Sequence, residues 1–460
     1  MLNITVGDVL KATGGTLLCG KENTAITDVV YDSRSVTENA LFVPIVGATV
    51  DGHKFIDQCF ADGASAAFTQ YDRTAPNGKA LIKVDNTLTA LQALSAWYRS
   101  LFPVTIIGVT GSVGKTSTKE MIAAALSKGL NVMKTKGNKN SQIGMPSTMF
   151  ELSKENEAAV IEMGMSEFGE MERLCAVARP KYAVMTNIGK AHIENLKTQE
   201  NIRSEKFKIT NYFTEDSILF LNGEDPLLWE LHNKQAFKTV TFGFSERCDY
   251  YAENITVNGL QTDFTVCYDN GKKYSLTIPA LGKHNVLNSL AAVAVGRALG
   301  LSLDCISEGL KTYKNAPMRQ QIHQLNDMIL IDDSYNASPE AMKVSLDVLK
   351  SVAKGKSIAV LADMLELGAV SETEHFNVGV HLAKNGIDNL ITVGTQAKFI
   401  ADGACSVNSN ITVFRTENNE QAAEILRTLL TPNCAVLVKG SRGMHTDHIV
   451  QKLLQEYLCN

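Results

Sequence analysis

Val104-Thr-Ile-Ile-Gly-Val-Thr-Gly-Ser-Val-Gly-Lys-Thr-Ser-Thr-Lys119 combines an apolar run, a turn bracketed by glycines and the start of a helix. The β-branched run 104–109 predicts a buried strand, and the apolar residues at 121, 122, 125 and 126 predict one face of a helix. The glycines let backbone N–H groups approach phosphate oxygens, and the N-terminus of the helix favours the anion. Lys115 adds a positive charge, and Thr116 offers a hydroxyl to Mg²⁺. The stretch therefore predicts a cradle for the phosphates of a nucleotide.

This loop is a shortened variant of the usual P-loop pattern, which has a glycine where Val109 stands. The alternative is a glycine turn that joins a strand to a helix and binds no ligand. We favour nucleotide binding because the strand, Gly-Lys-Thr and the helix follow one another in the required order. The candidate phosphate-binding residues are Thr110, Gly111, Ser112, Val113, Gly114, Lys115, Thr116 and Ser117.

Length and composition predict an ordinary soluble protein of about three domains, with 460 residues, 45% of them hydrophobic and 20% charged. A net charge of −5 and the lack of a basic stripe argue against nucleic acid as a partner. The first residues lack the pattern of a signal peptide, and the apolar stretch 286–301 is broken by polar residues, so we expect a buried helix and no membrane insertion. Nine cysteines without a C-x-x-C pair indicate free thiols, as in a cytoplasmic protein.

The pattern of apolar runs divides the chain into three segments. Residues 1–102 predict a small α/β domain that ends with a helix at 88–100. In 103–316, strands that alternate with helices predict a parallel sheet with crossover connections. Residues 317–460 repeat this rhythm and predict a doubly wound, Rossmann-like sheet. The expected strands lie at 40–44, 65–69, 80–84, 104–109, 158–163, 183–188, 328–331, 357–362, 389–393 and 434–438.

A change of pattern in the central segment predicts an antiparallel addition to its parallel sheet. Between about 216 and 281 the sequence alternates between apolar and polar residues, as in the runs 262–268 and 273–278. Asn-Gly pairs stand at 258–259 and 270–271, and such pairs between alternating runs are typical of hairpins.

Polar side chains that follow strands of the central segment are candidates for metal binding. Glu162 ends an apolar run in the same predicted sheet as the phosphate loop, so we favour Mg²⁺ binding over a charge that faces solvent. His192 follows the strand at 183–188, and the alternative to a ligand is a histidine at the surface or the edge of the core. From its sequence context alone, Lys206 is a lysine on the surface of a helix.

The third segment carries two polar turns that follow strands. Asp332 and Asp333 could hold a ribose or a metal, and Asn336 a base or a phosphate, but these residue types also stabilise turns. Lys439 and Arg442, in a glycine turn after the last strand, could grip an anion.

Taken together, these motifs resemble the Mur ligase family, the ATP-dependent amide-forming enzymes of peptidoglycan precursor synthesis. The resemblance spans essentially the whole chain and implies a UDP-binding domain, an ATPase domain and a Rossmann-like C-terminal domain. Within the family, DDSYNASPEAM together with LADMLELG points to the branch that adds D-alanyl-D-alanine to UDP-N-acetylmuramoyl-tripeptide, and away from the branch that adds diaminopimelate or lysine. The motifs are TGSVGKTS (110–117), GNKNSQIGMP (137–146), VIEMGM (160–165), TNIGKAHIE (186–194), LGKHNVLNSLAA (281–292), NAPMRQ (315–320), DDSYNASPEAM (332–342), LADMLELG (361–368) and LVKGSRG (437–443).

The resemblance implies ATP and Mg²⁺ as cofactors and gives roles to the candidate residues of the central segment. Lys115 matches the lysine that holds the β- and γ-phosphates, and Thr116 and Glu162 match the ligands of Mg²⁺. His192 matches the histidine that binds a second metal ion. Lys206, fourteen residues further on, matches a lysine that many members carbamylate into a metal ligand.

Other matches concern the rest of the nucleotide and the acceptor substrate. Asn285 and Asn288 match positions near the adenine. Arg319 matches an arginine that reaches the ATP phosphates from the third domain, and Asp333 matches the ribose-binding aspartate. The implied catalytic residues are Lys115, Lys206 and Arg319, and the implied substrate-binding residues are Ser33, Arg34, Asn138, Asn140 and Asn336.

The chain departs from the pattern of relatives in two places. Met318 stands where relatives often have the glycine of Pro-Gly-Arg, and GNKNSQIG (137–144) varies a stretch that often reads Asn-Asn. Two alternatives stay open. One is another Mur-type amide ligase, which adds a different amino acid or acts on a folate-like acceptor; the other is a P-loop ATP-binding switch without ligase chemistry. We expect a monomer whose domains close to assemble the site.

Overall fold

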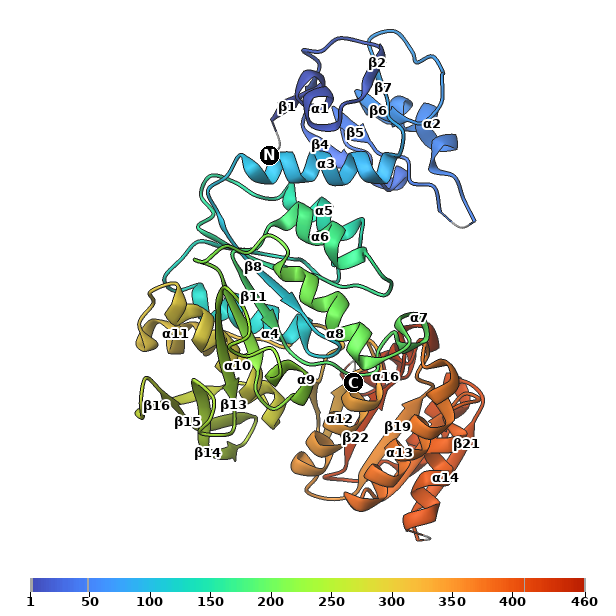
Figure 1. Cartoon of the computed structure of the whole chain (residues 1–460). Coiled ribbons are helices and arrows are strands. Elements are labelled where there is room, and N and C mark those ends of the chain that lie inside the picture. Colours follow the sequence, from blue (N-terminus) through green and yellow to red (C-terminus); the bar gives the residue numbers. More distant parts are fainter. Residues whose placement is uncertain (1–2, 48, 409, 459–460) are drawn as a thin grey trace.

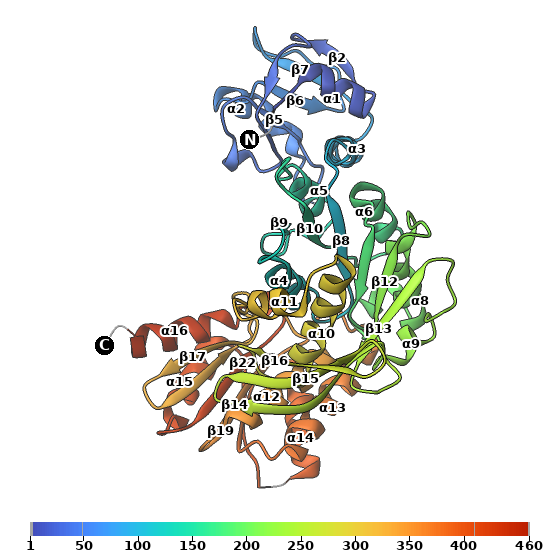
Figure 2. The same ribbon diagram turned by 90° about the vertical axis from the view of Figure 1, so that its left-hand side faces the viewer.

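Three large β-sheets, each covered by helices, form three domains in the computed structural model, which describes residues 3–47, 49–408 and 410–458. Figure 1 shows the domains in chain order, with the N-terminal domain at one end, the central domain in the middle and the C-terminal domain at the other end. The turned view in Figure 2 shows the N-terminal domain standing apart above the other two, which lie against each other. The α/β organisation in three domains that the sequence predicted is confirmed.

The N-terminal domain consists of β1 (Ile4–Thr5), α1 (Val6–Thr13), β2 (Thr16–Cys19), β3 (Ala25–Ile26), β4 (Asp28–Val30), η1 (Ser33–Ser35), β5 (Ala40–Phe42), η2 (Gly52–Phe55), α2 (Ile56–Ala61), β6 (Ala66–Thr69), β7 (Ala80–Lys83) and α3 (Thr87–Ser100). Its main sheet has the order β2-β7-β6-β5-β4, with β2 antiparallel to β7 and the other pairs parallel. The strands expected at 40–44, 65–69 and 80–84 are confirmed as β5, β6 and β7, and the helix expected at 88–100 as α3.

Helix α3 joins the first two domains because it packs into both. Asn86 caps its N-terminus by accepting a hydrogen bond from a backbone N–H of the first turn. Toward the central domain, the hydroxyl of Ser95 donates to the carbonyl oxygen of Pro146 over 2.7 Å, and Arg99 donates to that of Ala178 over 3.1 Å. The buried residues of α3 belong to one hydrophobic cluster that extends from the N-terminal sheet into the helices of the central domain.

The strands of the central domain are β8 (Thr105–Thr110), β9 (Val132–Lys134), β10 (Ala158–Glu162), β11 (Tyr182–Met185), β12 (Ile218–Asn222), β13 (Lys238–Gly243), β14 (Tyr250–Asn258), β15 (Gln261–Tyr268) and β16 (Lys272–Ile278). They form one sheet in the order β16-β15-β14-β13-β12-β11-β8-β10-β9. Because β8 lies between β10 and β11 and all three are parallel, the phosphate loop that follows β8 meets the carboxyl ends of both neighbours. The strands expected at 104–109, 158–163 and 183–188 are confirmed.

The antiparallel addition is confirmed, but it starts later than the sequence suggested. Strands β12, β13 and β14 still pair in parallel, and only β15 and β16 run antiparallel to their neighbours. Both predicted hairpins are present, with the left-handed glycines Gly259 and Gly271 in their turns. The expectation of an antiparallel region from residue 216 was wrong because alternation in a sequence reports one exposed face of a strand and not the direction of the strand.

The helices of the central domain cover both faces of its sheet; they are α4 (Lys115–Leu126), α5 (Gly144–Met149), α6 (Glu170–Ala178), α7 (Ile193–Leu196), α8 (Gln199–Phe207), α9 (Pro226–Trp229), α10 (Lys283–Ala298) and α11 (Leu303–Leu310), with η3 at Lys208–Thr210. Helices α4, α10 and α11 share a cluster with one face of β8, which presents Ile107 and Val109. Helices α5, α6 and α8 share the other cluster, toward which Ile106 points. The helix expected within 286–301 is the buried helix α10.

The C-terminal domain consists of β17 (Gln321–Leu325), β18 (Met328–Asp332), α12 (Pro339–Val352), β19 (Ser357–Ala362), η4 (Gly368–Val370), α13 (Ser371–Lys384), β20 (Asn389–Val393), α14 (Lys398–Val407), β21 (Thr412–Thr416), α15 (Asn419–Leu429), β22 (Ala435–Lys439), η5 (Arg442–Met444) and α16 (Asp447–Leu458). The sheet order is β17-β18-β22-β19-β20-β21, and β17 alone pairs antiparallel in the described part. Helices α12, α13 and α14 pack on one face, and α15 and α16 on the other. The doubly wound sheet and the four strands expected for this segment are confirmed.

We predict that Gly379→Ala destabilises the C-terminal domain. Helices α13 and α14 cross so closely that a Cβ at Gly379 would lie 1.9 Å from the carbonyl oxygen of Ile400, which is a backbone atom that cannot rotate away. Overpacking of this kind costs about 1–3 kcal/mol or more, against a gain in helix propensity of at most about 1 kcal/mol. Urea unfolding measures the change. The matched control is Asn377→Ala on the exposed face of α13, and equal stability of the two variants would contradict the prediction.

Candidate active site

A cleft of about 520 Å³ lies between the central and C-terminal domains. Its central side is formed by the phosphate loop, the ends of β10 and β11 and the start of α10, and its other side by the turns that follow β18, β19 and β22. The carboxyl ends of two parallel sheets therefore face each other across it. The sequence-predicted residues that line the cleft are Ser112, Val113, Gly114, Lys115, Thr116, Ser117, Asn140, Glu162, His192, Asn285, Asn288, Arg319, Asp333, Asn336, Lys439 and Arg442.

Two glycines give the phosphate loop its shape. Gly111 has a φ of 151°, and a Cβ at this position would lie 1.9 Å from Oγ1 of Thr186. Gly114 has a φ of 84° and stands in the left-handed conformation directly before α4. Glycine adopts both conformations without steric cost. The loop, which starts at the buried Thr110, is therefore pressed against the turn that follows β11 and leads directly into the helix.

Two lysine side chains meet at the carbonyl oxygen of Gly111. The Nζ atom of Lys115 lies 2.9 Å from this oxygen, and the Nζ atom of Lys206 lies 3.1 Å from it. Burial lowers the pKa of both lysines, and the positive charge of Lys115 lowers the pKa of Lys206 further. The interpretation of Lys206 as a surface lysine was wrong: it is 1% exposed, because its face of α8, which also carries Ile202, packs into the domain.

Glu162 is fully buried at the end of β10, so it is not the solvent-facing charge that the sequence left open. Its Oε2 accepts a hydrogen bond from Oγ1 of Thr116 over 2.9 Å, and its Oε1 accepts one from the amide of Asn140 over 2.7 Å. The carboxylate of Glu162 and the hydroxyl of Thr116 thus meet beside the phosphate loop. Oxygen ligands of this kind suit Mg²⁺, so the residues present fit the ion that the sequence predicted.

Lys119 lies beside Glu162, although sequence reasoning missed it. It is fully buried, and its Nζ atom lies 2.7 Å from the carbonyl oxygen of Thr135, 3.1 Å from Oε1 of Glu120 and 3.7 Å from Oε2 of Glu162. Helical periodicity could have found it, because it stands three residues before Ile122 on the apolar face of α4. Lys119 therefore ties the end of β10 to the strand beside it.

The turn that follows β11 supports the phosphate loop. Sequence reasoning also missed this support. Oδ1 of Asn187 accepts hydrogen bonds from the N–H groups of Ser112, over 3.0 Å, and of Val113, over 2.8 Å. The hydroxyl of Thr186 donates to the carbonyl oxygen of Val113 over 2.6 Å, and the N–H of Gly189 donates to Oγ of Ser112 over 2.9 Å. These contacts were hidden because they join segments more than seventy residues apart.

Two asparagines at the start of α10 form one end of the cleft. Oδ1 of Asn288 accepts a hydrogen bond from the hydroxyl of Thr118 over 2.9 Å, and its amide donates to Oδ1 of Asn285 over 3.2 Å. The amide of Asn285 donates to the carbonyl oxygen of Leu281 over 2.9 Å. His284 lies beside them in the lining, and burial lowers its pKa to about 4.

Arg319 brings a positive charge from the C-terminal domain. Its guanidinium lies over the ring of Tyr335, 4.1 Å from the ring centre, and its charge helps to lower the pKa of Lys115 across the cleft. Met318 has a φ of 59°, a conformation that the glycine expected from relatives would adopt freely. Its sulfur lies 3.6 Å from Nη1 of Arg442.

Asp333 is buried, and its carboxylate is already bonded. Oδ2 lies 2.6 Å from Nζ of Lys439 and accepts from the hydroxyl of Ser345 over 2.5 Å, while Oδ1 accepts from the N–H of Gln320 over 3.1 Å. Lys439 also donates to the carbonyl oxygen of Asn336 over 2.9 Å. The charge of Lys439, which the sequence offered as a possible anion ligand, is therefore already paired with Asp333.

The turn that follows β18 contains polar residues that stabilise the turn itself and polar residues that face the cleft. Oδ1 of Asp332 accepts hydrogen bonds from the N–H and the hydroxyl of Ser334, which is turn chemistry. Burial raises the pKa of Asp332. Asn336 and Arg442 are exposed at the cleft, where the N–H of Arg442 lies 3.4 Å from Oδ1 of Asn336.

His192 lines the cleft at the start of α7, next to the C-terminal domain. Its Nδ1 atom lies 2.7 Å from Oε2 of Glu366, and this contact lowers the pKa of Glu366. In the same loop, Nζ of Lys190 lies 2.6 Å from Oε1 of Glu374. Sequence reasoning missed both glutamates because each contacts a residue of a different domain.

Three candidate substrate-binding residues lie outside the lining of the cleft. Asn138 is exposed in the loop before α5. Ser33 and Arg34 belong to η1 in the N-terminal domain, where Asp32 caps the turn and lies 2.7 Å from the guanidinium of Arg34. The hydrogen bonds from Arg34 lower the pKa of Asp32 to about 2.

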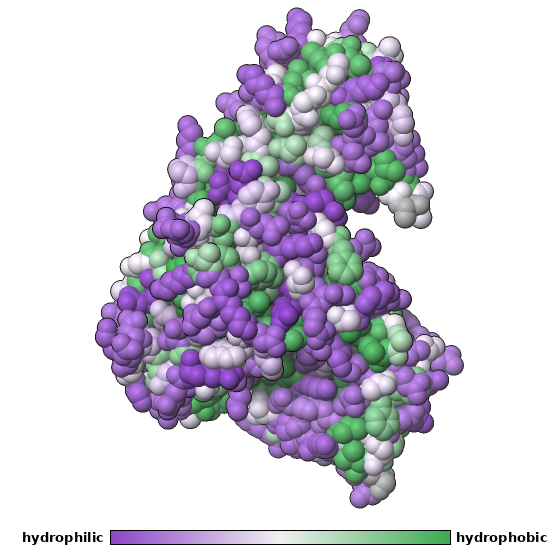
Figure 3. Space-filling view, in the orientation of Figure 1, coloured by the Kyte–Doolittle hydropathy of each residue, from purple (hydrophilic) through white to green (hydrophobic). Residues whose placement is uncertain are grey.

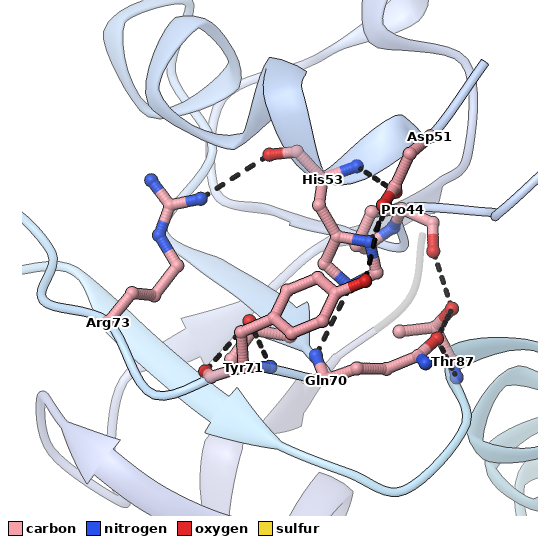
Figure 4. A network of polar contacts seen from close by, with 8 residues as sticks. Pro44, Asp51, His53, Gln70, Tyr71, Arg73 and Thr87 are labelled. Atoms are coloured by element: carbon pink, nitrogen blue, oxygen red, sulfur yellow. Dashed lines mark hydrogen bonds and ion pairs between the residues drawn. The ribbon is translucent and has the colours of Figure 1, made fainter.

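A polar network in the N-terminal domain fixes the loops at the carboxyl ends of β5 and β6 (Figure 4). Oδ1 of Asp51 lies 2.6 Å from Nδ1 of the buried His53, whose Nε2 accepts from the N–H of Gln70 over 3.1 Å. The hydroxyl of Thr87 donates to the carbonyl oxygen of Pro44 over 2.5 Å. The network therefore ties these loops to the start of α3.

Apolar side chains are exposed beside this network. Val46 is 53% exposed, Val50 42% and Tyr71 51%. In Figure 3, hydrophobic residues gather at the lower edge of the N-terminal domain, above the indentation that separates it from the rest of the molecule. Exposed apolar patches bordered by polar residues often mark binding sites.

Comparison with known proteins gives matches along the whole chain. Three family profiles match: "Mur ligase family, catalytic domain" at residues 25–99, "Mur ligase middle domain" at 109–296, and "Mur ligase, glutamate ligase domain" at 318–442. The UDP-N-acetylmuramoyl-tripeptide--D-alanyl-D-alanine ligase of Bacillus subtilis (strain 168) is 37% identical over 464 residues, which covers 100% of both chains.

Solved structures give the same result. The chain is similar to a crystal structure of MurF from Acinetobacter baumannii, with a TM-score of 0.91, 29% identity and 99% of each chain covered. It is also similar to the MurF ligase from Thermotoga maritima in complex with ADP, with a TM-score of 0.83 and 28% identity, over 94% of this chain and 98% of that chain. Among the described residues, no helix has the length and apolar character needed to cross a membrane.

We predict that His284 makes stability depend on pH between 6.5 and about 4. Burial lowers its pKa from the usual 6.5 to about 4, so in this window the unfolded chain binds a proton that the folded chain does not. The contribution is fully present above pH 6.5 and declines as the pH falls through the window. Urea unfolding of the wild type and of His284→Gln should therefore show a stability difference that changes with pH in this direction. His448→Gln, on the surface of the C-terminal domain, is the matched control; a constant difference for His284→Gln would refute the prediction.

Proposed function

The chain belongs to the Mur ligase family, and from this premise we propose that its cleft joins D-alanyl-D-alanine to UDP-N-acetylmuramoyl-tripeptide with ATP as the energy source. One observation carries the proposal. The phosphate loop of one domain and Arg319 of another line the same cleft, in a chain that matches the Bacillus subtilis ligase from end to end. The proposal makes the protein an acid–amino-acid ligase of peptidoglycan precursor synthesis.

The reaction consists of two displacements. A carboxylate oxygen of the tripeptide attacks the γ-phosphorus of ATP; an O–P bond forms, the bond to the β,γ-bridging oxygen breaks, and ADP leaves. The ammonium group of D-alanyl-D-alanine first loses a proton, and the neutral amine then attacks the acyl carbon; a C–N bond forms, the C–O bond to the phosphate breaks, and inorganic phosphate leaves with the second proton that the nitrogen gives up. Phosphoryl transfer requires positioning and neutralisation of charge more than a protein nucleophile.

The charged residues of the cleft supply this neutralisation. Lys115, which is bonded to the carbonyl oxygen of Gly111, exchanges this bond for phosphate oxygens when ATP binds. Arg319 reaches the same phosphates from the other domain, so the C-terminal domain must be docked for both charges to act. Asn285, Asn288 and Asp333 also line the cleft, where the two asparagines would bind the adenine and Asp333 the ribose.

Mg²⁺ is part of the proposal. When bound, it neutralises negative charge on the phosphates. Thr116 and Glu162 would hold it, since their oxygens lie 2.9 Å apart beside the loop. His192 and a modified Lys206 would hold a second ion.

Lys206 would serve as a ligand after carbamylation, because an ammonium group has no lone pair to give. In that reaction the neutral amine attacks CO₂, an N–C bond forms, one N–H proton leaves to solvent, and a carbamate anion results. Burial and the charge of Lys115 lower the pKa of Lys206, so both favour the neutral amine. The modification would also replace the positive charge beside Lys115 by a negative charge.

The other assignments complete the proposal. Ser33, Arg34 and the exposed apolar residues of the N-terminal domain would bind the UDP end of the tripeptide substrate. Asn138, Asn140 and Asn336 would bind its peptide end or the incoming dipeptide. We further propose domain limits at 1–102, 103–316 and 317–460, a monomer, and a place in the cytoplasm, where ATP and UDP-linked precursors are available.

A coupled assay of ADP release tests the function. With UDP-N-acetylmuramoyl-tripeptide, ATP and Mg²⁺, we expect phosphate release to require D-alanyl-D-alanine, and diaminopimelate, lysine or glutamate not to replace it. Lys115→Ala should lower turnover roughly 100-fold or more, because one charge that stabilises the transferring phosphoryl group is lost. Circular dichroism should stay unchanged, since Lys115 bonds only carbonyl oxygens of its own loop in the described structure. Phosphate release without any amine would point instead to a nucleotide switch.

The modification of Lys206 is tested separately. We expect activity to fall in CO₂-depleted buffer, to return with bicarbonate, and to rise with pH as the amine loses its proton. ¹³C NMR with labelled bicarbonate should show a carbamate signal that Lys206→Ala lacks and Lys208→Ala, which changes the next lysine of the segment, retains. Full activity without CO₂, together with no carbamate signal, would contradict the proposed modification of Lys206.

A further inference from the structure

Three carboxylates of the C-terminal domain hold one loop of the central domain, residues 189–194. Glu366 lies 2.7 Å from Nδ1 of His192, Glu374 lies 2.6 Å from Nζ of Lys190, and Glu340 accepts from the N–H of Lys190 over 3.2 Å. These glutamates come from the loop that follows β19, from α13 and from the first turn of α12. The loop is therefore a point at which the C-terminal domain grips the central domain.

The contact between Glu366 and His192 differs from the other two contacts in the backbone conformation of its residues. Both residues stand in the left-handed region, His192 with a φ of 63° and Glu366 with a φ of 64°. This region is uncommon for residues other than glycine, and such residues collect at functional sites. Here two of them, from two domains, meet through their side chains.

The backbone that carries Glu366 is fixed on its N-terminal side. The N–H of Met364 donates to Nε2 of the buried His375 over 2.9 Å, and the N–H of Leu365 donates to Oγ of Ser441 over 2.9 Å. The Glu366 side chain itself is 63% exposed, while that of His192 is 28% exposed. A rigid backbone thus presents an otherwise exposed carboxylate to the histidine.

Metal-binding histidines usually donate the N–H of their second ring nitrogen to a carboxylate or a carbonyl. That hydrogen bond fixes the ring and leaves the other nitrogen for the metal. In this protein Nδ1 of His192 lies at ion-pair distance, 2.7 Å, from Oε2 of Glu366 but without hydrogen-bond geometry, and neither ring nitrogen has a hydrogen-bond partner among the described residues. His192 also lines the cleft.

We infer that Glu366 is a positioning residue, which orients the His192 ring from the C-terminal domain so that Nε2 can bind the second metal ion. The inference rests on the metal role proposed for His192. It means that the central domain alone does not present a complete second metal site. Docking of the C-terminal domain adds the carboxylate that fixes the ligand.

The test uses Mn²⁺ in place of Mg²⁺, with the full chain and a β,γ-methylene analogue of ATP. Electron spin-echo measurements report the ¹⁴N coupling of a metal-bound imidazole, and electron paramagnetic resonance of free Mn²⁺ gives the affinity. The wild type should show the coupling, and His192→Ala should lack it. Glu366→Ala should weaken the histidine-bound Mn²⁺ roughly 10- to 100-fold, and Glu366→Gln should lie between, because its amide oxygen can accept a hydrogen bond from Nδ1 once the ring is oriented.

Two matched variants separate orientation of His192 from charge and from docking. Glu374→Gln removes a carboxylate that holds the same loop through Lys190, and Glu372→Gln removes an exposed charge from the same helix, α13. Both should keep the affinity of the wild type. Because Glu366 is largely exposed, its variants should keep the thermal unfolding of the wild type.

Each of the remaining outcomes overturns the inference, and the variants distinguish these outcomes from one another. Unchanged affinity in Glu366→Ala, while His192→Ala loses the coupling, would overturn the role of Glu366 and leave the proposed metal site standing. Equal losses in Glu374→Gln and Glu366→Ala would assign the effect to docking, and equal losses in Glu366→Gln and Glu366→Ala would assign it to charge. A wild type without the coupling would remove His192 from the metal site and the inference with it.

Discussion

The carbonyl oxygen of Gly111 accepts hydrogen bonds from two lysines, Lys115 and Lys206, and the chemistry of the cleft depends on this contact. One carbonyl dipole neutralises little of two positive charges, so this part of the phosphate loop favours an anion beside Lys115 or the loss of a proton from the buried Lys206. A triphosphate would satisfy the first need and a carbamate the second. The arrangement requires glycine at 111, because any Cβ there would collide with Thr186.

Four cations in or beside the cleft form two sets, which differ in what neutralises them. Lys439 is paired with Asp333, and Lys119 lies between Glu120 and Glu162, so their charges are balanced within the protein. Lys115 rests on a carbonyl oxygen, and Arg319 rests on the ring of Tyr335. Buried charges need partners. The second set is therefore the one that can turn to a substrate without leaving a carboxylate unpaired.

The cleft lies where two domains meet, and the contacts that join them beside it include ion pairs as well as Leu281 of the central domain, which is buried in the hydrophobic cluster of the C-terminal domain. A single exposed ion pair contributes about 0–1 kcal/mol, which is too little to lock two domains rigidly. By contrast, α3 ties the N-terminal domain to the central domain through a shared hydrophobic cluster and buried hydrogen bonds. The two boundaries of the central domain thus differ in kind: α3 spans one of them, and the other contains the cleft that must admit two substrates and a nucleotide.

The sequence by itself determined the strands, the glycine loop, the hairpins and the order of the domains, because each follows from patterns within a few turns or residues of backbone. It also placed Lys115, Thr116 and Glu162 in one site, since the carboxyl ends of neighbouring parallel strands must meet. Only the tertiary structure decided that Lys206 and Lys119 are buried, that Lys439 is neutralised by Asp333, and that Glu366 faces His192. The physical reason is the distance along the chain over which each property is determined. Backbone conformation responds to near neighbours, whereas the burial and pairing of a charge depend on segments that folding brings together from distant parts of the chain.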